Sequence, residues 1–282
     1  MAVLEGKSVV ITGAGSGLGR SLALALARKG CRIGIADIDM AGAEETLEMV
    51  VRNGGSGETW EMNARVADEV GAMADHFFSS WGGVDLLVNN AGVGMGGFTG
   101  DIPLEDWEWL ISVNFWGMVY GCHFFIPRMK KQGGGYILNV ASAMGITCMG
   151  EMAPYNTSKA AIISLSETLY SELAPDRIGV TALCPMFFNT NLFEHSRFGN
   201  DTEREIAYAA FNYSRMTTDE VAAAAIKAVE KGKLYCVPML SGKVHWAIKR
   251  ISPQLYYGSL AFLARRGWLN PLELWMARKG LV

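Results

Sequence analysis

A glycine-rich segment near the N-terminus constrains the fold more than any other feature of this chain. Residues 12–19 are TGAGSGLG, and they lie between a β-branched run at 7–12 and an alanine- and leucine-rich segment at 21–29. Glycines let the backbone turn tightly and approach a pyrophosphate, and a following helix offers free N–H groups and a positive dipole end. The context therefore predicts a strand–turn–helix unit that binds a dinucleotide, the alternative being a structural turn without a ligand.

Strand-like and helix-like segments continue to alternate after this unit. Apolar runs predict strands at 7–12, 31–36, 59–62, 84–88, 135–140, 178–183 and 234–237. Helical patterns lie at 21–29, 41–52, 66–80, 104–131 (as two helices), 155–173 and 218–231. Because the strands are continuously apolar, we expect a parallel sheet covered by helices on both faces. The predicted class is α/β, a doubly wound parallel sheet of the Rossmann type, with one domain at 1–240 and a helical C-terminal extension at 241–282.

The composition excludes several classes of protein. Half of the 282 residues are hydrophobic, 19% are charged and the net charge is -3, unlike a disordered or nucleic-acid-binding chain. The five cysteines form no CxxC pair, so we predict reduced thiols in a cytoplasmic protein and no metal site. The N-terminus lacks the pattern of a secretory signal. The most apolar stretch, residues 110–127, is interpreted as a buried helix rather than a membrane span.

An aspartate at the end of the second predicted strand bears on the choice of cofactor. Asp37 follows Gly19 by 18 residues. A carboxylate there accepts hydrogen bonds from the adenosine ribose hydroxyls and repels a 2′-phosphate, which favours NAD over NADP. A turn-forming aspartate is the alternative. Arg20, just past the glycine turn, keeps NADP open as the second cofactor.

Four polar residues form a candidate catalytic group. Tyr155 and Lys159 share one face of a predicted helix, where the ammonium would lower the pKa of the phenol. Such a tyrosine can exchange a proton with a substrate hydroxyl near neutral pH. Ser142 follows the strand at 135–140 and would reach a substrate oxygen, unless it caps a helix. Asn114 lies in an apolar helix, where it would bend the helix, hold a water or be structurally satisfied.

These motifs resemble the short-chain dehydrogenase/reductase family in its compact single-domain branch. The resemblance covers about residues 5–240 and is carried by TGAGSGLG, Asp37, Asn89-Asn90-Ala91-Gly92, Asn114, Ser142 and Tyr155-Asn156-Thr157-Ser158-Lys159, in the family's order. Each motif is modest alone, but the ordered set is specific. The resemblance implies an oxidoreductase that moves a hydride between a nicotinamide dinucleotide and an alcohol or ketone carbon.

The resemblance also implies catalytic roles. Tyr155 would be the general acid/base, and Lys159 would lower its pKa and bind the nicotinamide ribose. Ser142 would polarise or position the substrate carbonyl. Asn114 would hold a water in a proton relay that runs through Lys159.

A cofactor site is implied in the same way. Its residues would be Gly13, Ser16, Gly17, Leu18, Gly19, Asp37, Asn63, Asn90, Ala91, Gly92, Pro185 and Thr190, together with Tyr155 and Lys159. Two positions depart from the family's pattern. Asn63 stands where the family usually has an acidic residue that contacts adenine, and Met186 stands where a glycine often follows the proline. We expect the first change to alter affinity and the second to reshape the loop beside the nicotinamide.

The segment at 187–216, called the lid below, is long and rich in aromatic residues. In similar families such a segment is a mobile substrate lid, so its content suggests an apolar or aromatic substrate; simple packing on the core is the alternative. Its aromatic and leucine residues are Phe187, Phe188, Leu192, Phe193, Phe198, Tyr208, Phe211 and Tyr213. We expect the same pocket to be lined by Met95, Phe98, Met144, Met149 and Met152, because methionines suit an adaptable apolar site.

The last 42 residues, 241–282, called the tail below, differ in charge from the rest. They hold seven lysines and arginines against the single acidic residue Glu273, with six interleaved aromatic residues. Three interpretations stay open. The tail docks on a neighbouring subunit and helps to close the active site, packs on its own domain, or, as the less favoured case, makes peripheral contact with an anionic membrane.

We keep two further functional alternatives. A catalytically silent dinucleotide-binding sensor or scaffold would have the same fold without turnover, and an epimerase or dehydratase would turn over without net redox change. The partners expected are a small alcohol or ketone substrate and further copies of this chain in a homodimer or homotetramer. The apolar helices around 107–125 and 160–173 are suited to such subunit contacts.

Overall fold

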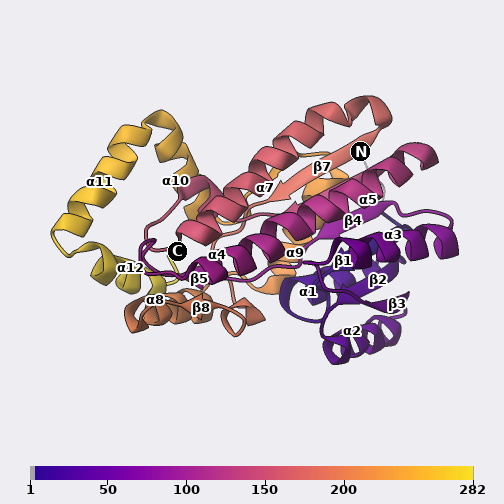
Figure 1. Cartoon of the computed structure of the whole chain (residues 1–282), viewed down its shortest axis with the longest axis horizontal. Coiled ribbons are helices and arrows are strands. Elements are labelled where there is room, and N and C mark those ends of the chain that lie inside the picture. The colour runs from indigo at the N-terminus through magenta and orange to yellow at the C-terminus, as the bar shows by residue number, and fades with distance from the viewer. Residues whose placement is uncertain (1–3, 282) are drawn as a thin grey trace.

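The computed structural model describes residues 4–281 and shows a seven-stranded parallel sheet between layers of helices (Figure 1). The strands lie in the order β3-β2-β1-β4-β6-β7-β9, and each neighbouring pair is parallel. Their bounds are β1 Ser8–Thr12, β2 Arg32–Asp37, β3 Ser56–Glu61, β4 Leu86–Asn89, β6 Gly135–Val140, β7 Ile178–Leu183 and β9 Tyr235–Cys236. The order reverses between β1 and β4, so their carboxyl ends flank the point where open α/β sheets bind ligands. The predicted doubly wound sheet is confirmed.

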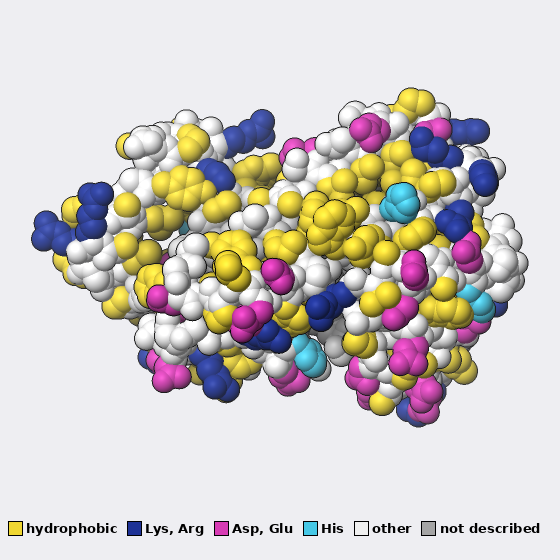
Figure 2. Space-filling view, viewed as in Figure 1, with side chains coloured by type: hydrophobic (Ala, Val, Ile, Leu, Met, Phe, Trp, Pro, Cys, Tyr) yellow, Lys and Arg dark blue, Asp and Glu magenta, His cyan; other side chains and the backbone are white. Residues whose placement is uncertain are grey.

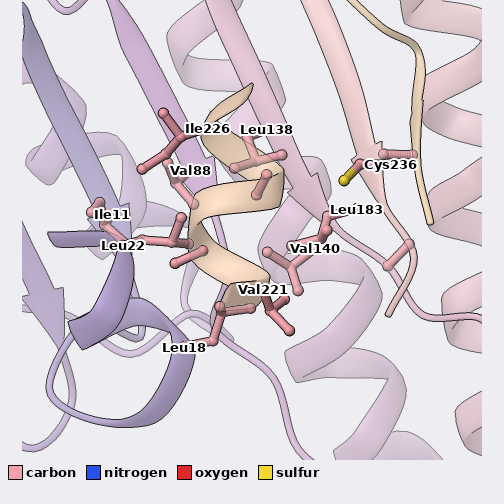
Figure 3. Close-up of a cluster of buried hydrophobic side chains, with 14 of the residues drawn as sticks. Ile11, Leu18, Leu22, Val88, Leu138, Val140, Leu183, Val221, Ile226 and Cys236 are labelled. Atoms are coloured by element: carbon pink, nitrogen blue, oxygen red, sulfur yellow. The ribbon is translucent and has the colours of Figure 1, made fainter. Parts of the chain in front are cut away.

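Two hydrophobic layers cover the faces of the sheet because successive strand side chains point to opposite sides. On one face Ile11 and Val88 pack with Leu22 of α1 and Val221 of α9 (Figure 3). On the other face the strands pack with α3, α5 and α7, where Phe77 and other large side chains are fully buried. The helices of these layers are α1 Gly17–Ala27, α2 Met40–Arg52, α3 Ala67–Trp81, α5 Gly117–Gln132, α7 Ala153–Glu172 and α9 Thr218–Glu230.

The segment predicted as two helices forms one continuous helix. α4 Leu104–Ile111 passes into α5 through a stretch of wider π-helical turns, Ser112–Trp116, that contains Asn114. By length and composition this helix, Leu104–Gln132, could cross a membrane, and about a third of its most apolar window is buried. The interpretation of 110–127 as a buried helix holds for one side of it, which packs on the sheet and α3. Trp116, His123 and Pro127 are exposed, and the remaining residues are buried or half-buried.

The lid and the tail contain structure that the sequence patterns did not resolve. Lid residues Arg197–Phe198 form β8, which pairs with β5 Met95–Gly96, and Asp201–Asn212 form α8. A short helix, α6 Met144–Thr147, follows β6. The tail forms three helices that extend away from the sheet in Figure 1. They are α10 Leu240–Ile251, α11 Pro253–Arg265 and α12 Leu269–Arg278.

Candidate active site

The glycine-rich turn between β1 and α1 requires its glycines. Gly13 and Gly17 have φ of 65° and 49°, a region that other residues rarely adopt. A Cβ on Gly13 would lie 2.8 Å from the Cα of Ala91, and one on Gly19 would overlap the Gly13 carbonyl oxygen. Ser16 is the N-cap of α1, yet its hydroxyl makes no capping bond, so the first N–H groups of the helix stay open to an anion.

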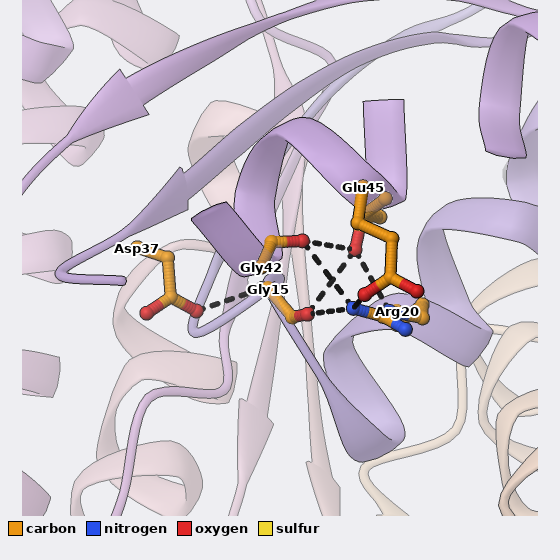
Figure 4. A network of polar contacts seen from close by, with 6 residues as sticks. Gly15, Arg20, Asp37, Gly42 and Glu45 are labelled. Carbon is orange, nitrogen blue, oxygen red and sulfur yellow. Dashed lines mark hydrogen bonds and ion pairs between the residues drawn. The ribbon is translucent and has the colours of Figure 1, made fainter. Parts of the chain in front are cut away.

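Asp37 and Arg20 hold this turn from two sides (Figure 4). A carboxylate oxygen of Asp37 accepts a 2.7 Å hydrogen bond from the Gly15 backbone N–H, and the other accepts from the Asp39 N–H. The Arg20 guanidinium donates to the Gly15 carbonyl at 2.5 Å, to the Thr46 hydroxyl and to Glu45. Arg20 is thus a structural residue of the turn, with its Nε and Nη2 donors engaged.

The loop after β4 is fixed to the turn by hydrogen bonds between side chains and backbone groups. The Thr12 hydroxyl accepts from the N–H groups of Asn90 and Ala91 at 3.0 and 3.1 Å. The Asn90 side-chain amide donates to the carbonyls of Thr12 and Gly13. Gly92 lies beside the Asn114 carbonyl oxygen and the Lys159 ammonium, which a Cβ would approach to 3.2 and 3.5 Å. The two loops therefore form one rigid edge.

A cleft of about 470 Å³ opens along this edge and collects most of the predicted cofactor residues. It is lined by Gly13, Ser16, Gly17, Leu18, Asp37, Asn63, Asn90, Ala91, Gly92, Tyr155, Lys159, Pro185 and Thr190. Gly19, Asn114 and Ser142 lie outside the lining. Sequence reasoning missed Arg65, Trp109 and His195, which also line the cleft. His195 belongs to the lid, and nothing in its local sequence marks it.

Tyr155 and Lys159 meet at one end of the cleft, both buried on the same face of α7. The Lys159 ammonium donates a 2.9 Å hydrogen bond to the Val140 carbonyl and lies 5.7 Å from the centre of the Tyr155 ring. Burial lowers the pKa of Lys159 to about 8. Burial also raises the pKa of Tyr155 to about 12, against a hydrogen bond with Ser142 that lowers it. The lowering of the Tyr155 pKa by Lys159 stays a prediction, with the ammonium bonded to the Val140 carbonyl in this structure.

Ser142 and Asn114 flank this pair. The Ser142 hydroxyl accepts from the Met144 N–H at 3.1 Å and donates to the Pro185 carbonyl at 3.4 Å. The Asn114 side chain bonds both backbone groups of Val93, at 2.8 and 2.9 Å. The wide turns of the π-helical stretch carry Asn114, as is common where such turns occur at functional sites. Its amide is therefore satisfied by the loop after β4.

A second, smaller cavity of about 60 Å³ adjoins the cleft at Tyr155. Apart from Ser142, Tyr155, Gly94 and Ser196, its lining is apolar: Met95, Met144, Met152, Pro185, Met186, Phe187, Phe188, Leu192, Phe198, Ala207 and Phe211. Two of the five residues expected to line this pocket do not do so. Phe98 is exposed, and Met149 lies outside the lining. Of the lid's aromatic residues, Phe193, Tyr208 and Tyr213 do not line the cavity.

The cleft fits a nicotinamide dinucleotide by its donors and its shape. The glycine-rich turn at Gly13, called the backbone cradle below, and the open first turn of α1 suit a pyrophosphate. Asp37 reaches the lining at the far end, where the ribose hydroxyls of an adenosine would be expected. Tyr155 and Lys159 lie at the other end, beside the apolar cavity. A cofactor lying between these ends would span the carboxyl edge of the sheet.

A comparison with protein families agrees with this geometry. The family model for short chain dehydrogenase matches residues 7–200. This chain belongs to the short-chain dehydrogenase family. Its glycine turn and its Tyr155–Lys159 pair both lie within the matched region.

Curated relatives of this short-chain dehydrogenase are named as oxidoreductases. The Mycobacterium tuberculosis protein "Probable oxidoreductase EphD" is 34% identical over 258 residues, which is 87% of this chain and 43% of EphD. The chain thus spans less than half the length of that relative. "Putative oxidoreductase SadH" of the same organism is 31% identical over 261 residues, which is 91% of this chain and 94% of SadH.

Solved structures extend the likeness to nearly the whole short-chain dehydrogenase. A short-chain dehydrogenase/reductase from Burkholderia phymatum, in complex with NAD, is 29% identical with a TM-score of 0.85, covering 90% of this chain and 96% of its own. A 3-ketoacyl-(acyl-carrier-protein) reductase from Brucella melitensis, complexed with NADH, is 30% identical with a TM-score of 0.73, covering 83% and 96%. Both of these solved structures hold a nicotinamide dinucleotide.

Proposed function

We propose that this chain transfers a hydride between NAD and the alcohol or ketone carbon of an apolar or aromatic substrate. One observation carries the proposal. Tyr155 lines both the nucleotide cleft and the small apolar cavity, so a single hydroxyl faces the place of the cofactor and the place of a substrate. Lys159 and Ser142 lie on its two sides.

Each residue of this group has a distinct task. When bound, the nicotinamide supplies the hydride acceptor for oxidation and the donor for reduction. The Tyr155 hydroxyl gives its proton to the substrate oxygen in reduction and takes one in oxidation. Ser142 donates a hydrogen bond to the same oxygen, and the Lys159 ammonium stabilises the phenolate that forms. Asn114 keeps the loop at Val93 in place, and the family resemblance gives it the further role of holding the water of a proton relay.

The preference for NAD over NADP is part of the proposal. The Asp37 carboxylate faces the cleft, where it would accept from ribose hydroxyls and repel a 2′-phosphate. The Arg20 guanidinium bonds Gly15, Thr46 and Glu45 through Nε and Nη2, and Arg20 is not part of the cleft lining, which disfavours it as a phosphate contact. Arg65, in the cleft lining, is the residue whose mutation would test a residual NADP affinity.

We further propose a homodimer or homotetramer in the cytoplasm. The outward side of the α4–α5 helix exposes Trp116, and that of α7 exposes Tyr170, which supports subunit contacts through these helices. All five cysteines are free thiols, in line with a reducing compartment. The apolar lining of the small cavity supports a hydrophobic substrate.

Removing one oxygen from Tyr155 tests the proposal. We expect Tyr155→Phe to lower kcat about 10²–10⁴-fold in NAD reduction with a panel of hydrophobic secondary alcohols, while the Kd for NAD stays unchanged. Tyr170→Phe, an exposed tyrosine on the same helix, is the matched control and should keep full activity. Assays with NADP run beside those with NAD, and a preference for NADP would contradict the role given to Asp37.

Two outcomes favour other functions. NAD binding by the wild type without turnover of any alcohol or ketone would support a silent sensor or scaffold. Substrate conversion without net change of free cofactor would support an epimerase or dehydratase on the same residues. Full activity of Tyr155→Phe would remove Tyr155 from the chemistry.

A further inference from the structure

The tail helices present a long exposed apolar stripe. Leu240, Val244, Ile248 and Ile251 recur at intervals of three or four residues, so they lie on one side of α10. Ile251 is 85% exposed, and Leu255, at the start of α11, is 75% exposed. Single exposed apolar residues are ordinary on a protein surface, but a contiguous row of branched aliphatic side chains marks a contact surface.

Five basic residues of the tail lack acidic partners in the described part of the chain, and two of them lie on α10 beside the stripe. Lys243, Arg250, Arg265, Arg266 and Lys279 are exposed, and none has an ion-pair partner among residues 4–281. The single acidic residue of the tail, Glu273, is half-buried, and burial raises its pKa to about 7. Figure 2 shows basic side chains at the outer end of the tail, among hydrophobic ones.

Aromatic side chains in and beside α11 and α12 are exposed as well. Trp268 and Trp275 are each about half exposed, and Phe262 lies edge-on to Trp268. Tryptophan, with an apolar ring and a polar N–H, favours the boundary between hydrocarbon and water. Exposed aliphatic, cationic and tryptophan side chains thus occur together on α10–α12.

The tail is nevertheless fixed to the body. The Lys249 ammonium donates to the Ile146 carbonyl, and the Tyr257 hydroxyl donates to that of Thr147 at 2.9 Å. The Asn270 amide donates to Glu151 at 3.3 Å. These bonds join α10 and α11 to α6, and α12 to the turn before α7, so the apolar stripe has a fixed position on the body.

We propose that α10–α12 dock on the surface of an anionic lipid bilayer, with the apolar stripe in the headgroup region and the basic residues against lipid phosphates. An in-plane amphipathic helix with basic and tryptophan residues binds such a surface through buried apolar area and charge attraction together. The tail of a second copy is disfavoured as the partner of this surface, because pairing of two tails would bring like charges together. The acidic body of a second copy is the remaining competitor.

Vesicle sedimentation of the full chain tests the proposal without any activity assay. We expect the wild type to bind mixed phosphatidylcholine–phosphatidylglycerol vesicles and not to bind pure phosphatidylcholine vesicles. The protein should dissociate from the mixed vesicles as the salt concentration rises. The double variant Lys243→Gln/Arg250→Gln should weaken binding by about fivefold for each charge removed. The variant Ile251→Ser/Leu255→Ser should weaken binding at least tenfold, since two large side chains leave the lipid.

Matched controls separate surface docking from general effects. Lys231→Gln and Leu104→Ser change an exposed lysine and an exposed leucine outside the tail and should leave vesicle binding unchanged. Failure of the wild type to bind anionic vesicles at low salt would overturn the proposal, as would equal binding by the tail variants. If the apolar variant instead lowers the mass measured by light scattering while no vesicle binding occurs, a second copy covers this surface and the lipid proposal is wrong.

Discussion

The two ends of the cleft are constructed in different ways. At the nucleotide end, the turn after β1 is held by hydrogen bonds from side chains to its main chain and by glycines that no larger residue can replace. At the substrate end, the loop after β6, the lid and α12 meet through apolar side chains and buried ionisable groups, among them Lys159 and Glu203. The first end depends on exact backbone position, and the second on desolvation.

This difference predicts different sensitivities. A backbone cradle tolerates no added volume, because close-packed main chain cannot move aside without disturbing its hydrogen bonds. A desolvated end tolerates changes of shape in its apolar lining, but its stability follows the protonation of the groups that it buries. Mutations at the nucleotide end should therefore act at every pH, and those at the substrate end should act within defined pH windows.

The largest effect is expected for Gly19→Ala. The added Cβ would overlap the Gly13 carbonyl oxygen and crowd the Asn90 amide, so the turn itself must shift. We expect the Kd for NAD to rise at least about 100-fold, equivalent to ~2.8 kcal/mol, at both pH 6 and pH 9, measured by calorimetry. Gly100→Ala is the control, since a Cβ there meets open space. Normal NAD binding by Gly19→Ala would show that the backbone of the turn can shift without loss of binding. The nucleotide end would then tolerate added volume as the substrate end does.

The nucleotide end was predictable because it is local. TGAGSGLG, the strand before it and the helix after it are neighbours in sequence, and the structure places Gly13, Ser16 and Gly17 in the cleft as expected. The strands β6 and β7 were predicted at their observed bounds, since buried β-branched runs end at turn residues. The edge strand β3 begins three residues earlier than predicted, because half-exposed strands carry polar residues.

The substrate end was predictable in composition but not in arrangement. The lid's apolar character is visible in the sequence, yet which of its side chains enter the cavity depends on α8 and β8, whose contacts are distant in sequence. His195 reaches the cleft only through that arrangement. The continuous α4–α5 helix escaped prediction because its π-helical turns are specified by the Asn114–Val93 bonds, which no local pattern reveals.

The second prediction concerns Lys159 at the substrate end. Burial lowers its pKa from 10.5 to about 8, so the folded protein binds fewer protons than the unfolded chain between these values. Stability should thus rise with pH from about 8 to 10.5, and the full penalty of the buried charge should be present below pH 8. At pH 7 we expect Lys159→Met to raise the Tm by roughly 2–6 °C while lowering kcat by about 10²-fold or more.

Thermal unfolding followed by circular dichroism measures this effect, and the gain in Tm should shrink as the pH approaches 10.5. Lys231→Met, at an exposed lysine, is the control and should change neither quantity. A lower Tm for Lys159→Met at pH 7 would mean that its hydrogen bond to Val140 outweighs the desolvation of the ammonium. The substrate end would then resemble the nucleotide end in depending on a main-chain bond.

The smallest effect is expected for Glu203 of the lid helix α8. Its side chain is buried, one carboxylate oxygen has no hydrogen-bond partner among the described residues, and the carboxylate of Glu151 faces it, with Glu273 beyond. Burial, followed by the Glu151 contact, raises the pKa of Glu203 to about 7, while Asn200 opposes the rise. The folded protein therefore binds more protons than the unfolded chain between pH 4.5 and 7, and stability falls as the pH rises through that window.

Replacing the carboxylate by its neutral amide should remove this loss. We expect Glu203→Gln to match the wild type in Tm at pH 4.5 and to exceed it by about 2–4 °C at pH 8, because the amide carries no charge into the buried pair. Glu194→Gln, at an exposed lid position, should follow the wild type at both values. An equal Tm for Glu203→Gln and the wild type at pH 8 would show that the pair is solvated, so that desolvation at the substrate end would be confined to Tyr155 and Lys159.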